Sequence, residues 1–280
     1  MPRRRSALYV PASNTRALDK ARSLPCDVLI LDLEDAVAPE AKMSARQNAA
    51  TAVRSGGFIA AEIVVRINGL DTEWGAADVA AVLPACPTAL LLPKVDGVDD
   101  LRAASALLAA QPQTTLWAMI ETPGAMLRLD SIAGSGGPLR CLVAGTNDLT
   151  KEAGMEVGAD RHELLPGLFL LVMAARAHGL AVLDGVCNEL NDPEGLTRQC
   201  RQARAFGFDG KTLIHPDQIE PCHAAFAPDA AQVAAAQRIV AAFADPSNAG
   251  RGALRVDGRM VERLHLMQAR RTLRMAGLPD

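Results

Sequence analysis

Three polar residues stand at the ends of three apolar runs in this sequence. Arg66 ends the run IVVR, Glu121 follows LWAMI, and Asp148 ends AGTND. Short aliphatic runs of this kind are typical of buried β-strands, and residues that follow parallel strands in a barrel meet at one mouth. Two carboxylates and a guanidinium gathered there would hold a divalent cation and an anionic carbonyl substrate. The pattern therefore indicates an enzyme.

Glu121 and Asp148 are the predicted metal ligands, because their runs are consecutive and should lie side by side. Two carboxylates, completed by water and substrate oxygens, are how Mg²⁺ is usually held in proteins. An all-oxygen set without a nearby histidine argues against zinc and copper. We therefore expect Mg²⁺, with Mn²⁺ as the alternative ion.

Three further carboxylates, Asp32, Glu34 and Asp35, occur in the segment DLED after an apolar run. They would repel one another unless a cation or an arginine lay close. We expect Glu34 and Asp35 to orient the water molecules of the metal. Asp32 has two open roles, one in the site and one in a buried ion pair with Arg66 or Lys94. Arg66 either binds a substrate carboxylate or enolate oxygen or pairs with these acids, and the two roles are compatible.

Other polar segments are weaker candidates. The backbone N–H groups of loop 145–149 (GTNDL) could bind a substrate carboxylate. His215, which precedes a proline, is expected to fix a loop by hydrogen bonding rather than to transfer protons. Arg3 and Arg4 are expected in a solvated tail before the first strand. The sequence has no G-x-S-x-G, P-loop or G-x-G-x-x-G motif, so serine hydrolase, nucleotidase and Rossmann functions lack support.

Eight aliphatic runs recur along the chain, and helical stretches separate them. The runs are 7–11, 28–33, 63–67, 89–93, 116–120, 141–144, 180–184 and 208–214. The helices with the clearest start signals are expected over 15–24, 39–54, 99–110 and 192–206. Eight strand–helix units predict an α/β fold, a closed (β/α)₈ TIM barrel.

The barrel is expected to span 1–244 as one catalytic domain. Segment 245–256 is rich in Pro, Gly, Ser and Asn, which is typical of a linker, and a short helix is expected across 258–275. We therefore interpret 245–280 as a linker and C-terminal helical lid or arm.

Composition excludes several classes of protein. The 280 residues are 49% hydrophobic but only 3% aromatic, so the core must be aliphatic, as in a parallel sheet covered on both faces. A net charge of −3 gives no argument for binding nucleic acid or a membrane. No signal peptide or membrane-spanning run is apparent. The six cysteines form no C-x-x-C pair, and a cytoplasmic, reducing location is expected.

Seven motifs occur in order between residues 3 and 220. They are RRRSALYVPAS, DVLILDLEDAV, VVRINGLDTEW, LLPKV, MIETPGA, AGTNDL and FGFDGKTLIHPDQI. Together they resemble the citrate lyase β-subunit (CitE-like) family of the HpcH/HpaI aldolase superfamily, which includes malyl-CoA and citramalyl-CoA lyases. The resemblance implies a magnesium-dependent (β/α)₈ barrel, assembled as a homotrimer or hexamer, that cleaves or forms a C–C bond beside an acyl thioester.

The resemblance also implies roles for the residues at the strand ends. Glu121 and Asp148 match the metal ligands of the family. Arg66 matches the group that polarises the keto-acid carbonyl, and Glu34 and Asp35 match acids that support the metal site.

Three further matches concern the acyl-CoA. Asp257, in RVDGRMVE, matches a tail aspartate that reaches into the site of a neighbouring subunit. It would protonate the thioester enolate during cleavage, or take the methyl proton during condensation. Arg16 and Lys20 match basic residues that contact the nucleotide end of CoA.

The leading hypothesis is a lyase acting on a β-hydroxyacyl-CoA such as malyl-, citramalyl- or citryl-CoA, which gives a short acyl-CoA and a keto acid. A cation and an arginine would stabilise the oxygen on which negative charge develops. Three alternatives stay open. They are a citrate lyase β subunit acting on an acyl-carrier-protein thioester, a CoA thioesterase or malate-synthase-like enzyme, and a non-catalytic CoA-binding subunit.

Overall fold

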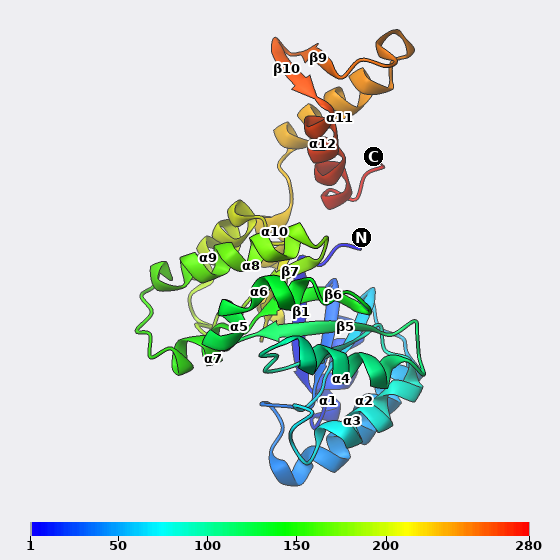
Figure 1. The fold of residues 1–280 in the computed structure, drawn as a ribbon, viewed down its shortest axis with the longest axis vertical. Helices are drawn as coiled ribbons and strands as arrows, with labels where there is room; N and C mark the ends of the chain where they lie inside the picture. The colour runs from blue at the N-terminus through cyan, green and yellow to red at the C-terminus, as the bar shows by residue number, and fades with distance from the viewer. Residues whose placement is uncertain (1, 280) are drawn as a thin grey trace. The chain divides into compact units, whose positions relative to one another are not determined.

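Eight parallel strands close into a barrel in the order of the sequence, and β8 pairs with β1. Figure 1 labels β1, β5, β6 and β7 of this barrel. The structure is a computed structural model that describes residues 2–279. The strands are β1 (Ser6–Pro11), β2 (Val28–Asp32), β3 (Glu62–Arg66), β4 (Ala89–Leu92), β5 (Thr115–Ile120), β6 (Leu139–Ala144), β7 (Ala181–Asp184) and β8 (Gly210–Leu213). Each of the eight predicted runs coincides with one strand, so the predicted TIM barrel is confirmed.

Helices follow the strands along the chain. They are α1 (Thr15–Ala21), α2 (Lys42–Ser55), α3 (Gly75–Val82), α4 (Val98–Leu108), α5 (Pro123–Leu127), α6 (Leu129–Ala133), α7 (Thr146–Glu152), α8 (Leu165–Ala177), α9 (Pro193–Phe206) and α10 (Ile219–Phe226). Two of the predicted start signals act as expected, whereas α2 and α4 begin at Lys42 and Val98 rather than at 39 and 99. The side chain of Asn14 accepts a hydrogen bond from the N–H of Ala17 at the start of α1, and Asp192 does the same for Gly195 in α9.

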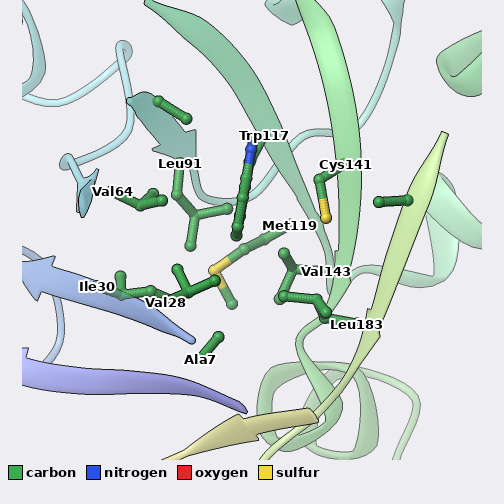
Figure 2. Packing of buried hydrophobic residues seen from close by; sticks show 12 residues of the cluster. Ala7, Val28, Ile30, Val64, Leu91, Trp117, Met119, Cys141, Val143 and Leu183 are labelled. Atoms are coloured by element: carbon green, nitrogen blue, oxygen red, sulfur yellow. The ribbon is translucent and has the colours of Figure 1, made fainter. Parts of the chain in front are cut away.

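Small aliphatic side chains fill the barrel around two larger ones, Trp117 and Met119 (Figure 2). Successive residues of a strand point to opposite faces, so the interior positions are two residues apart. Val28 and Ile30 occupy such positions on β2, and Val64 does so on β3. Few aromatic residues are needed, because the interior of an eight-stranded barrel is narrow enough for aliphatic side chains to fill.

The same alternation aims polar residues at the carboxyl end of the barrel. Ile30 and Val64 lie in the core cluster, and Asp32 and Arg66 stand two residues further along β2 and β3. Glu121, just beyond β5, likewise follows Met119 by two. Since residues two apart share a face, the pleat that builds the core also directs these three side chains toward the barrel axis.

The prediction of a solvated N-terminal tail is wrong for Arg4. Arg4 is 7% exposed, its Nε and Nη2 lie 2.6 and 2.9 Å from the carboxylate of Glu62, and its guanidinium stacks over the ring of Trp117. Arg3 is exposed, as predicted. The partner of Arg4 is 58 residues away in sequence, so no local pattern could reveal the pair.

Arg4→Met is expected to lower the free energy of unfolding by about 1.5–3 kcal/mol, because it removes charged hydrogen bonds and leaves Glu62 buried without them. Urea unfolding followed by circular dichroism measures the change. Arg3→Met is the matched control and should change stability by less than about 0.5 kcal/mol. Equal effects of the two substitutions would contradict a structural role for Arg4.

Contacts divide the chain into two units, Pro2–Ala225 and the segment from Phe226 onward. The second unit contains α11 (Ala230–Ala244), β9 (Ala253–Val256), β10 (Arg259–Glu262) and α12 (Arg263–Met275). The division falls before α11, whereas the sequence pattern placed 230–244 with the barrel. The physical reason is that Ala236 of α11 packs with Ala269 and Leu273 of α12 in a small core of their own.

The segment from 253 to 262 differs from its predicted structure. The residues expected as the end of a linker and the start of a helix form the antiparallel pair β9–β10, and α12 begins only at Arg263. Asp257 and Gly258 make the two-residue turn, with φ angles of 50° and 78°. Asp-Gly between two short runs is a strong hairpin signal, because both residues tolerate positive φ. Among residues 2–279, no helix has the length and apolar character to cross a membrane.

Candidate active site at the mouth of the barrel

A cavity of about 280 Å³ lies at the carboxyl ends of the barrel strands. Its lining includes Asp32, Asp35, Arg66, Glu121 and Asp148, so the structure brings together five of the charged residues that the sequence singled out. The other lining residues are Tyr9, Ala36, Met119, Ala144, Gly145, Thr146, Asn147, Val186, Asn188, Thr212 and Ile214. The concave, mixed polar and apolar surface is typical of a small-molecule site.

Arg66 is held rigidly by Asp32. Its Nε and Nη2 donate to the two oxygens of the Asp32 carboxylate, each over 2.7 Å. Both residues are buried, and the guanidinium stacks over the ring of Tyr9. Although burial opposes it, the charge of Asp32 raises the pKa of Arg66. The ion pair that the sequence left open for Asp32 is therefore formed, and it fixes the plane of the guanidinium at the cavity.

The remaining edge of Arg66 faces the other acids of DLED. Its Nη1 lies 3.0 Å from Oε2 of Glu34 and 3.3 Å from Oδ2 of Asp35. The first separation is that of an ion pair, yet no N–H points at Oε2, which is buried without a hydrogen-bond donor. Burial raises the pKa of Glu34 to about 8, with Arg66 opposing and Asp35 adding to the shift. Asp35 is more open, with 60% of its side chain exposed.

Lys42 organises the DLED turn, a role that sequence reasoning missed. Its Nζ donates to the carbonyl oxygens of Leu33 and Glu34, each over 2.8 Å, and to Oδ1 of Asn68 over 2.7 Å. The side chain is 6% exposed, and burial lowers the pKa of Lys42. A lysine eight residues after a strand-end acid gives no signal of its own, since the contact depends on how α2 packs.

Glu121 presents one satisfied and one free oxygen. Its Oε1 accepts the backbone N–H of Lys94 over 2.6 Å, while Oε2 is buried and has no hydrogen-bond partner in the described chain. Gly145 makes room for it, because a Cβ there would lie 2.4 Å from Oε2. Burial raises the pKa of Glu121 to about 7, the Lys94 amide opposes this, and Asp148 adds to it.

The donor set fits a hydrated Mg²⁺ ion. Asp148 is half-buried in the first turn of α7 and lines the cavity with Glu121. An orphaned, buried carboxylate oxygen beside a second carboxylate is what a missing cation would satisfy. Within residues 2–279, no three His, Cys, Asp or Glu side chains gather as a metal site, so water and substrate would complete the shell, as Mg²⁺ prefers.

The residues predicted for CoA lie at different places. Arg16 and Lys20 are exposed on α1, just beyond the carboxyl end of β1, and neither forms an ion pair with another residue of 2–279. Asp257 belongs to the second unit, where its carboxylate accepts a 2.7 Å hydrogen bond from Nε of Arg238. Its role toward a neighbouring subunit stays a prediction.

Two minor sequence candidates have clear positions. Nδ1 of His215 accepts the N–H of Asp217 over 3.2 Å and so fixes the turn after β8, as predicted. Lys94 is exposed, and its ammonium forms no ion pair with Asp32 or Glu34 in the described structure. The expectation of a loop over 145–149 is wrong, because α7 begins at Thr146 and only Gly145 precedes the helix.

Comparisons with known proteins find similarity along nearly the whole chain. The model of the HpcH/HpaI aldolase/citrate lyase family matches residues 5–216, and that of C–C bond lyases of the TIM-barrel fold matches 167–278. A (3S)-malyl-CoA thioesterase of Cereibacter sphaeroides (strain KD131) is 47% identical over 97% of this chain and 94% of its own. The citrate lyase subunit beta of Escherichia coli K12 is 32% identical over 98% of this chain and 94% of its own.

A solved structure extends the similarity over the whole chain. CitE from Mycobacterium tuberculosis, in complex with magnesium, acetoacetate and coenzyme A, has a TM-score of 0.79 and 31% sequence identity. The match covers 98% of each chain.

Proposed function

Because this chain belongs to the HpcH/HpaI aldolase/citrate lyase family, we propose that it is a magnesium-dependent enzyme acting on a β-hydroxyacyl-CoA with a distal carboxylate. We place (3S)-malyl-CoA first as substrate, and hydrolysis of its thioester to malate and CoA as the net reaction. The observation that carries the proposal is the 47% identity to a (3S)-malyl-CoA thioesterase over nearly the whole chain.

The acidic pair Glu121 and Asp148 would hold the cation, Mg²⁺ or alternatively Mn²⁺. When bound, the cation would supply a Lewis acid that polarises a substrate oxygen. The free Oε2 of Glu121 supports this assignment, because a buried carboxylate oxygen without a donor is costly unless a cation satisfies it.

Arg66 would stabilise negative charge on the substrate, and Asp35 would accept a proton. The Nη1 edge of Arg66, held in place from the other side by Asp32, would stabilise the oxygen on which charge develops. Asp35 lines the cavity and would accept a proton, either from an attacking water molecule or from the β-hydroxyl of the substrate. Glu34, which lies beside Nη1 of Arg66, would help to hold the guanidinium in place. Arg16 and Lys20 would bind the phosphates of CoA.

Cleavage of the C–C bond is the second candidate reaction, and it was the leading hypothesis from the sequence. The two family models and the 32% identity to a citrate lyase subunit beta favour it. Cleavage of malyl-CoA would give acetyl-CoA and glyoxylate, and the thioester enolate formed on the way must be protonated at carbon. Hydrolysis needs no such proton, so the two reactions make different demands on the protein.

Product analysis separates the two reactions. Purified protein is incubated with (3S)-malyl-CoA and Mg²⁺, and malate, glyoxylate, CoA and acetyl-CoA are quantified by mass spectrometry. Equal amounts of malate and CoA support hydrolysis, whereas equal amounts of glyoxylate and acetyl-CoA move the assignment to a lyase. Absence of turnover would contradict both reactions on (3S)-malyl-CoA. Citramalyl-CoA, citryl-CoA and a thioester on an acyl carrier protein would then be tested as substrates, and a non-catalytic role would follow if none reacts.

Asp257→Asn tests the proposed contribution of the C-terminal unit in a homotrimer or hexamer. If Asp257 of one subunit protonates the enolate in another, the substitution should lower acetyl-CoA formation by about 10²–10⁴-fold and malate formation by less than about tenfold. Asparagine tolerates the positive φ of the turn, so the hairpin should persist. Asp229→Asn, which keeps the cap of α11, is the control. Equal loss of both products would speak against an acid role.

A further inference from the structure

Lys94 has an unusual backbone conformation at the edge of the proposed site. It follows β4 and has a φ of 50°, in the left-handed region that few residues other than glycine adopt. The φ angle of a residue sets the direction of its own N–H relative to the chain that follows. The N–H of Lys94 donates to Oε1 of Glu121 over 2.6 Å. A strained residue whose amide binds a cavity carboxylate is a candidate for a functional constraint.

The other side of the Glu121 carboxylate is shaped by Gly145. A Cβ at position 145 would lie 2.4 Å from both Cβ and Oε2 of Glu121, so only glycine leaves this rotamer free. The Lys94 amide therefore fixes one oxygen, and the bare backbone at 145 leaves room for the other. Together they leave Oε2 as the oxygen without a donor.

The side chain of Lys94 acts in a different way from its backbone. The residue is exposed, and no ion pair of its ammonium with a residue of 2–279 is formed. Lys94 lines a second cavity at this edge together with Glu34 and Asp35. A positive charge beside these acids opposes the binding of another cation nearby.

We propose that Lys94 is a positioning residue for Glu121, and that its left-handed backbone holds Oε1 so that Oε2 is presented to a divalent cation. The inference rests on the proposed function, in which Glu121 is a metal ligand. The backbone of Lys94 raises the affinity for the cation and its ammonium lowers it, so the two contributions have opposite signs and can be separated.

Lys94→Asn and Lys94→Val form the decisive pair. Both remove the charge, but asparagine tolerates positive φ and a β-branched residue does not. Binding of Mn²⁺ to the full-length protein, without substrate, is followed by electron paramagnetic resonance and that of Mg²⁺ by calorimetry. We expect Lys94→Asn to bind as tightly as the unchanged protein or more tightly. Lys94→Val should bind at least about tenfold more weakly than Lys94→Asn, the loss typical of residues that orient a ligand.

The melting temperature of the metal-free protein separates positioning from stability. Equal affinities in the two variants would overturn the proposal, even if Lys94→Val melts earlier. If Lys94→Val does not fold, Lys94→Gly and Lys94→Ala repeat the comparison with small side chains. We then expect Lys94→Ala to bind the cation about threefold more weakly than Lys94→Gly, because glycine adopts positive φ without strain. If the unchanged protein binds neither ion, the metal assignment itself falls, and the Lys94 proposal with it. If all variants bind the cation equally tightly, the positioning role of Lys94 is contradicted and the metal assignment of Glu121 stands.

Discussion

Glu121→Gln is expected to lower kcat/KM by about a thousandfold while leaving the barrel folded. A metal that polarises the substrate supplies several kcal/mol of transition-state stabilisation, and each 1.36 kcal/mol is a factor of ten in rate. Glutamine keeps the shape of the side chain and can still accept the Lys94 N–H, but it lacks the charge that a cation requires. Steady-state kinetics with the active substrate and Mg²⁺ calorimetry measure the two losses.

The same substitution should stabilise the metal-free protein at high pH. The folded-state pKa of Glu121 is raised to about 7 from an ordinary value of 4.5, so the folded form holds its proton more tightly than the unfolded chain. The stability linked to this proton is fully present below pH 4.5 and is lost as the pH rises through 7. Glu121→Gln removes that loss, so its melting temperature should exceed that of the unchanged protein by a few degrees at pH 8 but not at pH 4.5.

Glu220→Gln is the matched control, since Glu220 is exposed in the first turn of α10. It should change neither activity nor the pH dependence of melting. A Glu121→Gln enzyme that keeps more than about a tenth of the activity would remove Glu121 from the metal site, whatever its effect on melting.

Asp184→Asn is expected to lower the free energy of unfolding by about 3–5 kcal/mol. Asp184 on β7 is fully buried and lies 2.8 Å from Nζ of Lys211, which is also fully buried. It receives Nη1 of Arg161 as well, over 3.0 and 3.1 Å. Removal of the carboxylate charge leaves two buried cations without their anion. Urea unfolding at pH 7 measures the loss.

The pH dependence of the stability loss in Asp184→Asn follows from the direction in which the pKa of Asp184 is shifted. Burial alone would raise the pKa of Asp184, but Lys211 and Arg161 lower it below the ordinary value of 3.8. The contribution of the carboxylate is present above the unfolded-state pKa and is lost as the pH falls through the folded-state pKa. The difference between Asp184→Asn and the unchanged protein should therefore be constant from pH 8 to about pH 4 and narrow below it.

Two further variants test the cause of the loss. Asp99→Asn breaks an exposed ion pair with Arg102 and should cost less than about 1 kcal/mol. Asp184→Leu combined with Lys211→Met replaces the Asp184–Lys211 pair by apolar groups. It should recover part of the stability, because only Arg161 then remains buried without its anion. A loss below about 1 kcal/mol for Asp184→Asn would contradict a structural role of this buried pair.

The sequence by itself determined the strands, and with them the location of the site. Eight aliphatic runs specified eight parallel strands, because buried strands need continuous apolar residues and each must be followed by a crossover. Arg66, Glu121 and Asp148 were recognisable from their position after such runs. Residues two apart on a strand share a face, so the core residues and the polar residues beyond them obey one local rule.

The tertiary structure alone decided which charged residues pair. Nothing near Arg4 indicates Glu62, and Asp184 meets Lys211 and Arg161 only when neighbouring strands and a distant loop come together. The cost of burying a charge depends on its partner. The sequence offered Arg66 or Lys94 as the partner of Asp32, and only the structure decided for Arg66. The same holds for the Lys94 amide, whose direction toward Glu121 depends on a backbone angle that composition does not reveal.

The C-terminal unit shows the same contrast between what local sequence signals predict and what long-range packing decides. The Asp257–Gly258 turn is a local signal that predicts the β9–β10 hairpin, although a composition rich in small polar residues suggested a linker. The assignment of α11 to this unit depends on packing, because Ala-rich helices such as α11 fit many surfaces and carry little information about their partner. Local rules therefore specify elements and strand-end residues, whereas long-range packing decides which partners stabilise buried charge and orient the ligands of the site.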